Sequence, residues 1–280
     1  MEFVQGFLEK PEKTAAPPAE VEEVVKEQRK TYATLLCNES YFNGVCVLVK
    51  TIKKHCSGRF PITVLVDQAN VSRATIVRLK GMVDFVIEVD TLLHDYKKPT
   101  SATADATSTP WAASEMTKLR LWDLHADFDK VVYVDADCML LDCIDDLFER
   151  CSAVDFAAAP DVFPPDKFNA GVLVLKPDAA VFRDMCSRLS DTYAYDGGDT
   201  GVLNAYYPEW YSGSVAQRLP FGYNMQRTMY WFTYQKRPGY WDIVQPKKIV
   251  HFSSSPKPWE MSMAAAKGDL ELQWWLTLMS

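Results

Sequence analysis

Short apolar runs and amphipathic stretches alternate along the first third of the chain. The runs at 31–37, 62–67 and 85–90 are rich in β-branched and aromatic residues, which is typical of strands. Between them, apolar residues recur at helical spacing around 41–52 and 72–80. Strand, helix, strand, helix and strand at these spacings predict an α/β fold, with a Rossmann-like, mixed but mostly parallel sheet flanked by helices.

The central apolar run ends in two carboxylates. Residues 130–134 form a continuous β-branched and aromatic segment, as expected for a parallel strand buried on both faces, and Asp135 and Asp137 follow directly. Ligands of open α/β sheets bind at the carboxyl ends of such strands. Carboxylates two residues apart in an extended segment point to one side, so both can reach a single hard cation. This pair is the most informative feature of the sequence.

The remaining pattern predicts the limits of one domain. Residues 1–30 are charged and have few large apolar groups, which predicts a flexible tail. Residues 97–113 are small, polar and bounded by prolines, which predicts a long loop. We expect residues 31–280 to form a single catalytic domain. Its further elements should be a helix with Leu119 and Trp122, strands at 156–159, 171–176 and 248–252, and a closing helix at 270–279.

Composition and charge exclude several classes of function. A net charge of -7 and a pI near 5.2 argue against a nucleic-acid-binding surface, so an acidic ligand must be held by local cations. No apolar run is long enough to span a membrane or to form a signal-peptide core. No Gly-x-Gly-x-x-Gly follows the first expected strand, which disfavours a dehydrogenase. The seven cysteines follow no metal-finger spacing, and we expect reduced thiols and a cytoplasmic location.

A third metal ligand should come from another strand end. His251 qualifies because it lies late in an expected strand that enters a turn. Two carboxylates and an imidazole suit Mn²⁺ better than Ca²⁺ and leave positions open for a substrate's phosphates. Lys257 lies between two prolines and is well placed to neutralise a phosphate. The alternatives are a core histidine at 251 and loop or capping carboxylates at 135 and 137.

Five short motifs lie one after another between about residues 31 and 260. They are Asp135-x-Asp137, Asn169-Ala170-Gly171-Val172, Asp196-Gly197-Gly198-Asp199, Leu219-Pro220-Phe221-x-Tyr223-Asn224 and His251-Phe252-x-x-x-x-Lys257-Pro258-Trp259. In this order and with these gaps, the chain resembles the glycogenin-like glycosyltransferases, which are family 8 of the retaining, GT-A-fold enzymes. Each motif alone is a weak signal, whereas five in order are specific.

The resemblance implies a nucleotide-sugar donor, usually UDP-linked, and a bound Mn²⁺ ion. The metal ligands would be Asp135, Asp137 and His251. The residues that it places around the donor are Leu35, Asn38, Tyr41, Asp135, Ala136, Asn169, Ala170 and Lys257. Of these, Leu35, Asn38 and Tyr41 would line the uridine. A helix cap at Asn38 and a core-facing ring at Tyr41 are the alternative interpretations.

The resemblance also implies three catalytic residues, Asp196, Asp199 and Lys118. Asp199 is preferred near the anomeric carbon, where a carboxylate can stabilise an oxocarbenium-like sugar or act as a transient nucleophile. Front-side displacement and a covalent intermediate both stay open. Lys118 on a helix would otherwise be a solvated charge, and Asp199 could simply cap a helix after Gly197 and Gly198.

The expected acceptor is a separate molecule. Self-glucosylating members of the family modify a tyrosine after the Leu-Pro-Phe-x-Tyr-Asn motif, but the corresponding residue here is Trp231, which has no hydroxyl. Tyr230 and Tyr234 lie on either side of it. Thr200 also replaces the glutamine that usually follows the second aspartate of Asp-Gly-Gly-Asp, so sugar recognition is expected to differ.

Within the family, the missing tyrosine favours the cytoplasmic protist and oomycete α-galactosyltransferases that extend a glycan on an SCF ubiquitin-ligase adaptor. UDP-galactose is then the expected donor and UDP-glucose the second choice. Two alternatives stay open, a glycogenin-type self-glucosylating primer of glycogen synthesis and a non-catalytic nucleotide-sugar-binding protein. A homodimer is also considered, with Trp274 and Trp275 as core or dimer contacts.

Overall fold

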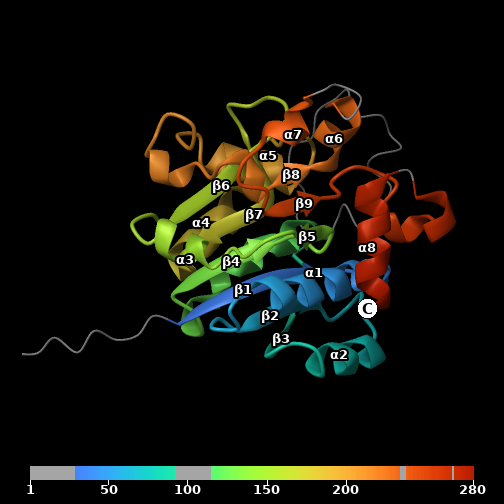
Figure 1. Cartoon of the computed structure of the whole chain (residues 1–280). Helices are drawn as coiled ribbons and strands as arrows, with labels where there is room; N and C mark the ends of the chain where they lie inside the picture. Colours follow the sequence, from blue (N-terminus) through green and yellow to red (C-terminus); the bar gives the residue numbers. More distant parts are fainter. Residues whose placement is uncertain (1–28, 93–114, 234–237, 267) are drawn as a thin grey trace, which may run out of the picture.

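A six-stranded sheet crosses the centre of the structure, a computed structural model that describes residues 29–92, 115–233, 238–266 and 268–280 (Figure 1). The strand order is β3-β2-β1-β4-β7-β6. β3, β2, β1 and β4 are parallel, β7 is antiparallel to β4, and β6 is antiparallel to β7. The predicted mixed, mostly parallel sheet is confirmed. The strands are β1 (Lys30–Leu36), β2 (Ile62–Asp67), β3 (Phe85–Val89), β4 (Lys130–Val134), β6 (Phe156–Pro160) and β7 (Phe168–Leu175).

Three sequence predictions fall outside the described residues. They concern residues 1–28 of the expected tail, the expected loop at 97–113, and Tyr234. Within the ranges that the structure does describe, no helix combines the length and the apolarity that a membrane crossing requires.

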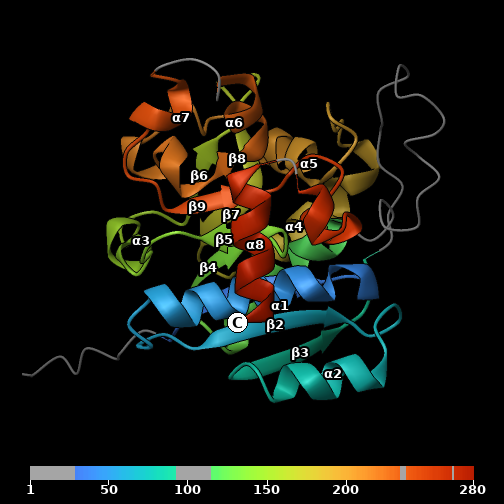
Figure 2. The same ribbon diagram turned by 45° about the vertical axis from the view of Figure 1, so that its right-hand side comes forward.

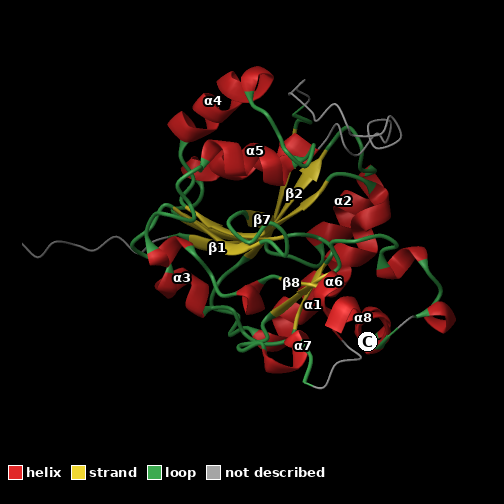
Figure 3. Cartoon of the chain, turned by 90° about the horizontal axis from the view of Figure 1, so that it is seen from above, coloured by secondary structure: helices red, strands yellow, loops and turns green. Residues whose placement is uncertain are grey.

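Helices cover both faces of the central sheet (Figure 3). Val132 and Val134 of β4 pack toward one face, while Val131 and Tyr133 pack toward the other, as the alternation of side chains along a strand requires. The first face packs against α1 (Phe42–His55), α2 (Arg73–Lys80) and α3 (Asp146–Arg150); the second packs against η3 (Glu115–Ala126), α4 (Ala179–Arg188) and α5 (Asp199–Tyr206). The expected helix with Leu119 and Trp122 is thus η3, and it has 3-10 geometry.

A second, three-stranded sheet lies against the carboxyl end of β4. It contains β5 (Cys138–Leu140), β9 (Ile249–His251) and β8 (Met225–Gln226), in the order β5-β9-β8. β5 is antiparallel to β9, and β8 is parallel to it. The strand expected at 248–252 therefore belongs to this small sheet, and it brings residues near 250 beside the Asp135–Asp137 segment.

The C-terminal helix α8 (Asp269–Met279) packs across α1, close to α6 (Arg227–Thr233) and α7 (Tyr240–Ile243) (Figure 2). Trp274 is fully buried in a third apolar core, and the ring of Trp275 meets it edge-on at 5.3 Å. Core and dimer contacts were the two roles considered for these tryptophans, and Trp274 packs in the core. The predicted closing helix is therefore part of the fold.

Candidate active site

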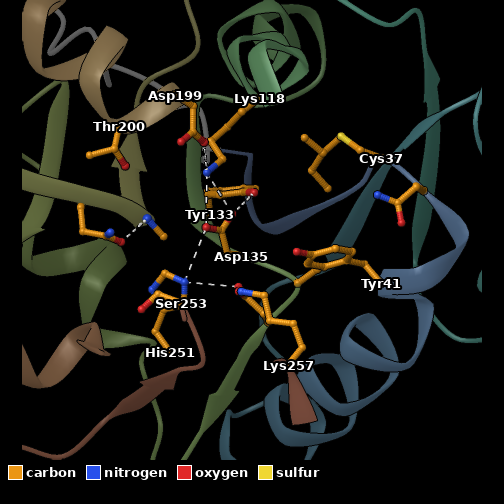
Figure 4. Close-up of a pocket in the computed structure, with 16 residues that line it drawn as sticks. Cys37, Tyr41, Lys118, Tyr133, Asp135, Asp199, Thr200, His251, Ser253 and Lys257 are labelled. Atoms are coloured by element: carbon orange, nitrogen blue, oxygen red, sulfur yellow. Dashed lines mark hydrogen bonds and ion pairs between the residues drawn. The ribbon is translucent and has the colours of Figure 1, made fainter. Parts of the chain in front are cut away.

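The backbone around Asp135 and Asp137 joins the two sheets. The N–H of Asp135 donates to the carbonyl of Gly171 on β7 (2.8 Å), and its own carbonyl accepts from Cys138 (3.0 Å) to close a turn. Cys138 is then paired with His251 across β5 and β9. Asp135 and His251, far apart in sequence, consequently face the same space (Figure 4), and Asp137 lines it with them.

His251 has the geometry of a metal ligand. Its Nε2 lies 3.3 Å from Asp137 Oδ1 and 3.9 Å from Asp135 Oδ2. Its Nδ1 donates to Asn224 Oδ1 at 2.8 Å, which leaves Nε2 as the ring nitrogen that faces the two carboxylates. Nε2 and the carboxylate oxygens can share a cation, either a proton on Nε2 or, once that proton has left, a metal ion. Two carboxylate oxygens and an imidazole nitrogen fit a divalent transition metal such as Mn²⁺.

Asn224 and Asn169 hold the imidazole in place. Asn169 Oδ1 accepts from Asn224 Nδ2 and from the N–H of Gly171, both at 2.9 Å, and this fixes the oxygen of Asn224 toward His251. A Cβ atom at residue 171 would lie 2.3 Å from Cε1 of the His251 ring, so only glycine leaves room for the imidazole. The Asn-Ala-Gly segment therefore positions a candidate metal ligand as well as lining the site.

Lys118 of η3 joins Asp135 to Asp199. Its Nζ lies 3.0 Å from Asp135 Oδ1 and 3.2 Å from the carbonyl of Ala170, and it forms an ion pair with Asp199. The residue is only 5% exposed. Burial lowers the pKa of Lys118, but Asp135 and Asp199 outweigh this effect and raise it above the usual value. Lys118 is therefore a permanent cation between a candidate metal ligand and the candidate catalytic carboxylate, not a solvated charge.

Lys257 forms the corresponding pair with Asp137. Its Nζ lies 2.5 Å from Asp137 Oδ2 and 2.8 Å from the carbonyl of Phe252. Burial opposes ionisation of Asp137, but His251 and Lys257 outweigh it and lower the pKa of this carboxyl. For Asp135, burial raises the pKa despite Lys118. The two acids therefore ionise unequally, as expected when carboxylates share a buried site.

These groups open into a cavity of about 220 Å³. The residues that line it are Leu35, Cys37, Asn38, Tyr41, Lys118, Tyr133, Asp135, Ala136, Asp137, Asn169, Gly171, Asp199, Thr200, His251, Ser253 and Lys257. The cavity thus brings together nearly all the predicted donor, metal and catalytic residues. Asn38 also accepts from the N–H of Ser40 as the cap of η1 (Glu39–Tyr41), so the capping interpretation of Asn38 holds, and its predicted contact with uridine stays a prediction.

Two predicted site residues do not line the cavity. Ala170 contributes only its backbone carbonyl, which accepts from Lys118. Asp196 Oδ1 accepts from the N–H groups of Gly198 and Gly201 at 2.9 Å each and so holds the turn before α5. Asp196 therefore supports the start of the helix that carries Asp199, and its predicted catalytic role remains a prediction.

Comparison with known proteins identifies the family. The profile of Glycosyl transferase family 8 matches residues 33–262. The chain belongs to glycosyl transferase family 8. Glycogenin-1 of Mus musculus is 33% identical over 230 residues, which cover 82% of this chain and 65% of the mouse protein. The chain thus spans slightly less than two-thirds of that relative's length.

Solved structures show the same fold. The galactosyltransferase LgtC aligns with a TM-score of 0.60 at 17% identity, over 89% of this chain and 95% of that one. GlyE of Streptococcus pneumoniae TIGR4 aligns with a TM-score of 0.63 at 18% identity, over 90% of this chain and 61% of that one. The predicted GT-A fold and family are confirmed, and membership in family 8 supports a glycosyltransferase with glycogenin-like sequence.

In this family 8 protein, the structure gives contacts to some site residues for which the sequence predicted none. Tyr133 donates its hydroxyl to Asp135, and its ring lies 5.2 Å from Lys118 Nζ. Thr200 Oγ1 accepts from the N–H of Ala170 at 3.0 Å and fixes the cavity wall. Asn224 belonged to a quoted motif but received no role. Alternation along β4 places Tyr133 on the same side as Asp135, and this signal was available in the sequence.

Proposed function

We propose that this protein is a retaining glycosyltransferase that moves a hexose from a UDP-sugar to a separate acceptor, with Mn²⁺ as its metal. The observation that carries the proposal is the position of His251 Nε2, which faces Asp135 and Asp137 inside a cavity that also contains two buried lysines. Bound there, Mn²⁺ would stabilise negative charge on the departing diphosphate.

The chain's own residues supply the remaining electrostatics. When the bond between the anomeric carbon and the diphosphate breaks, negative charge develops on the leaving oxygen. Lys257, held by Asp137 and the Phe252 carbonyl, lies where it can donate to that group. Asp199, oriented by Lys118, presents a carboxylate to the cavity for the developing positive charge on the sugar. Front-side displacement and a transient covalent intermediate both use this arrangement.

The acceptor side supports a separate substrate. Trp231, at the position of the self-glucosylated tyrosine, lies with its ring 4.2 Å from the guanidinium carbon of Arg227. Tyr230 packs edge-on against Trp241 at 5.6 Å. The tyrosines that line the cavity, among described residues, are Tyr41 and Tyr133. We therefore favour a protein-linked glycan as acceptor, with an SCF ubiquitin-ligase adaptor as the expected carrier.

The donor and location follow from the same proposal. We place UDP-galactose first and UDP-glucose second, because the missing acceptor tyrosine favours the α-galactosyltransferases within the family. Thr200, which replaces the usual glutamine, lines the cavity together with Asp199. The seven cysteines form no disulfide among the residues that the structure describes, which fits the cytoplasm. A homodimer remains part of the proposal for the oligomeric state.

Self-glucosylation is the second candidate, because the relatives to which this chain is similar include glycogenins. Purified protein incubated with UDP-glucose and Mn²⁺ would then gain hexose masses, and Tyr230→Phe or Tyr234→Phe would abolish the gain. Our proposal expects no gain. The same mass measurement on a glycan-bearing acceptor should show one added hexose with UDP-galactose.

One experiment tests the proposal as a whole. Donor hydrolysis without acceptor is measured for a panel of UDP-sugars with and without Mn²⁺. We expect cleavage that needs the metal, fastest with UDP-galactose. A strict preference for UDP-glucose would favour the glycogenin-type function. Binding of UDP and Mn²⁺ without any turnover would instead identify a non-catalytic nucleotide-sugar-binding protein.

A further inference from the structure

The segment between His251 and Lys257 carries two groups of the site at its ends. His251 faces the carboxylate pair, Lys257 contacts Asp137, and Ser253 lines the cavity between them. The N–H of Phe252 donates to the Asp137 carbonyl at 3.0 Å, which fixes the segment's first residue. Contacts that orient the residues between Phe252 and Lys257 therefore set the position of the Lys257 ammonium.

Arg227 binds the middle of this segment. Its Nη2 donates to the carbonyl of Ser254 (2.6 Å), the hydroxyl of Ser254 (3.0 Å) and the carbonyl of Pro256 (2.9 Å). The guanidinium carbon also lies 5.3 Å from the centre of the Phe252 ring. The guanidinium thus meets three oxygen atoms of one loop through Nη2, while Nη1 donates to Glu271 Oε1, and lysine with its single nitrogen cannot make both sets of contacts.

Glu271 of α8 supplies the counter-charge. Arg227 Nη1 lies 3.1 Å from Glu271 Oε1, and both residues are 0% exposed. Burying a guanidinium without a carboxylate partner would cost folding free energy. Glu271 offsets this cost for Arg227. Burial lowers the pKa of Arg227, and Glu271 opposes that shift.

Helix α8 is itself firmly attached to the fold. Leu270 and Trp274 are buried in the third apolar core. At the other end, Lys50 of α1 donates to the carbonyls of Thr277 (3.3 Å) and Leu278 (2.7 Å). Glu271 therefore projects from a fixed element, and it lies beyond residues 33–262, the part matched by the family profile.

We propose that the buried Arg227–Glu271 pair is a positioning device, through which α8 holds the Ser254–Pro256 segment so that Lys257 stays aligned for the donor diphosphate. This inference rests on the proposed function for the role of Lys257. The pair touches no substrate; it acts through the loop. Removing groups that orient a ligand-binding side chain typically changes affinity by about 10–100-fold.

The test uses the double variant Arg227→Met with Glu271→Leu. Replacing both members of a buried ion pair by apolar residues of similar size often preserves stability, so the variant should fold. Calorimetry with Mn²⁺ and UDP should give a Kd raised about 10–100-fold. Hydrogen–deuterium exchange of residues 252–257 without ligand should be faster than in the wild type. Leu270→Ala, on the same helix, is the matched control, and it should lower the melting temperature but leave Kd unchanged.

A cycle with Lys257→Met shows whether the pair acts through that lysine. In the Lys257→Met background, removing the pair should add little further loss of affinity. A folded double variant with wild-type Kd, or an undiminished loss in that background, would overturn the inference. If the double variant does not fold, Arg227→Lys decides: a several-fold rise in Kd supports the inference and an unchanged Kd refutes it. A wild type that binds Mn²⁺ and UDP but never cleaves a UDP-sugar would refute only the proposed function.

Discussion

Replacing Asn224 by leucine should weaken Mn²⁺ binding through a change in the tautomer of His251. In the structure, Nδ1 of His251 donates to Asn224 Oδ1 at 2.8 Å, and Nε2 faces Asp137 Oδ1 at 3.3 Å. Leucine has a similar size but accepts no hydrogen bond. His251 is 4% exposed, so no bulk water replaces the lost acceptor. The proton should then move to Nε2, where it can be donated to Asp137, and the lone pair for the metal is lost.

The expected loss of Mn²⁺ affinity follows from the unpaired Nδ1–H of His251 in the Asn224→Leu variant. An unsatisfied buried donor costs about 1–3 kcal/mol, and this free energy favours the tautomer with the proton on Nε2. Since about 1.4 kcal/mol corresponds to tenfold, the apparent Kd for Mn²⁺ should rise about 10–100-fold. Measured losses at groups that orient metal-bound histidines span the same range, about 10–100-fold.

Free Mn²⁺ measured by electron paramagnetic resonance, in the presence of UDP, gives this affinity directly. Donor hydrolysis should shift to higher Mn²⁺ concentration by the same factor and recover at saturation. Asn224→Asp is the matched control, because its carboxylate still accepts from Nδ1 and should keep the tautomer of His251. A folded Asn224→Leu protein that binds Mn²⁺ as tightly as the wild type would refute the reasoning.

Three further predictions concern the same site. Gly171→Ala should fold, as judged by circular dichroism, but lose Mn²⁺ affinity in calorimetry, because its Cβ would lie 2.3 Å from a ring carbon of His251. Lys257→Met should lower kcat for donor hydrolysis about 100-fold, the loss expected when one charge-stabilising donor is removed, while folding is retained. Asp135→Asn with Asp137→Asn should abolish Mn²⁺-dependent hydrolysis in the same assay; undiminished activity would exclude the metal site altogether.

The sequence predicted the parts of the site that depend on strong local patterns. The unbroken apolar run 130–134 predicted a buried central strand. Because ligands of open α/β sheets bind at the carboxyl ends of the strands, it also predicted a binding site where this strand ends. Asp135 and Asp137 are there in the structure, and His251 reaches them from β9. The repeated strand–helix pattern likewise predicted the parallel half of the sheet.

The parts that escaped prediction depend on contacts between distant segments. β8 has two residues, too few for any periodic signal, yet it follows Asn224 and places that residue beside His251. The sequence alone does not indicate why residue 171 must be glycine. In the structure, the imidazole of His251 occupies the space that a side chain at residue 171 would need. Arg227 would be read as a charge at the start of a short helix, and its burial against Glu271 is set only by the docking of α8.

The charges around the cavity explain how an acidic chain can hold an acidic ligand. Asp135, Asp137 and Asp199 oppose Lys118 and Lys257, which leaves one negative charge in excess in a chain whose net charge is already -7. Such a site repels a diphosphate unless another cation enters. Under the proposed function, a divalent ion at Asp135 and Asp137 would reverse the sign and weaken their hold on the lysines, so that the ammonium groups could turn to phosphate oxygens. On this proposal, the close pairing of acids and lysines is the arrangement of the site before a metal and a nucleotide enter together.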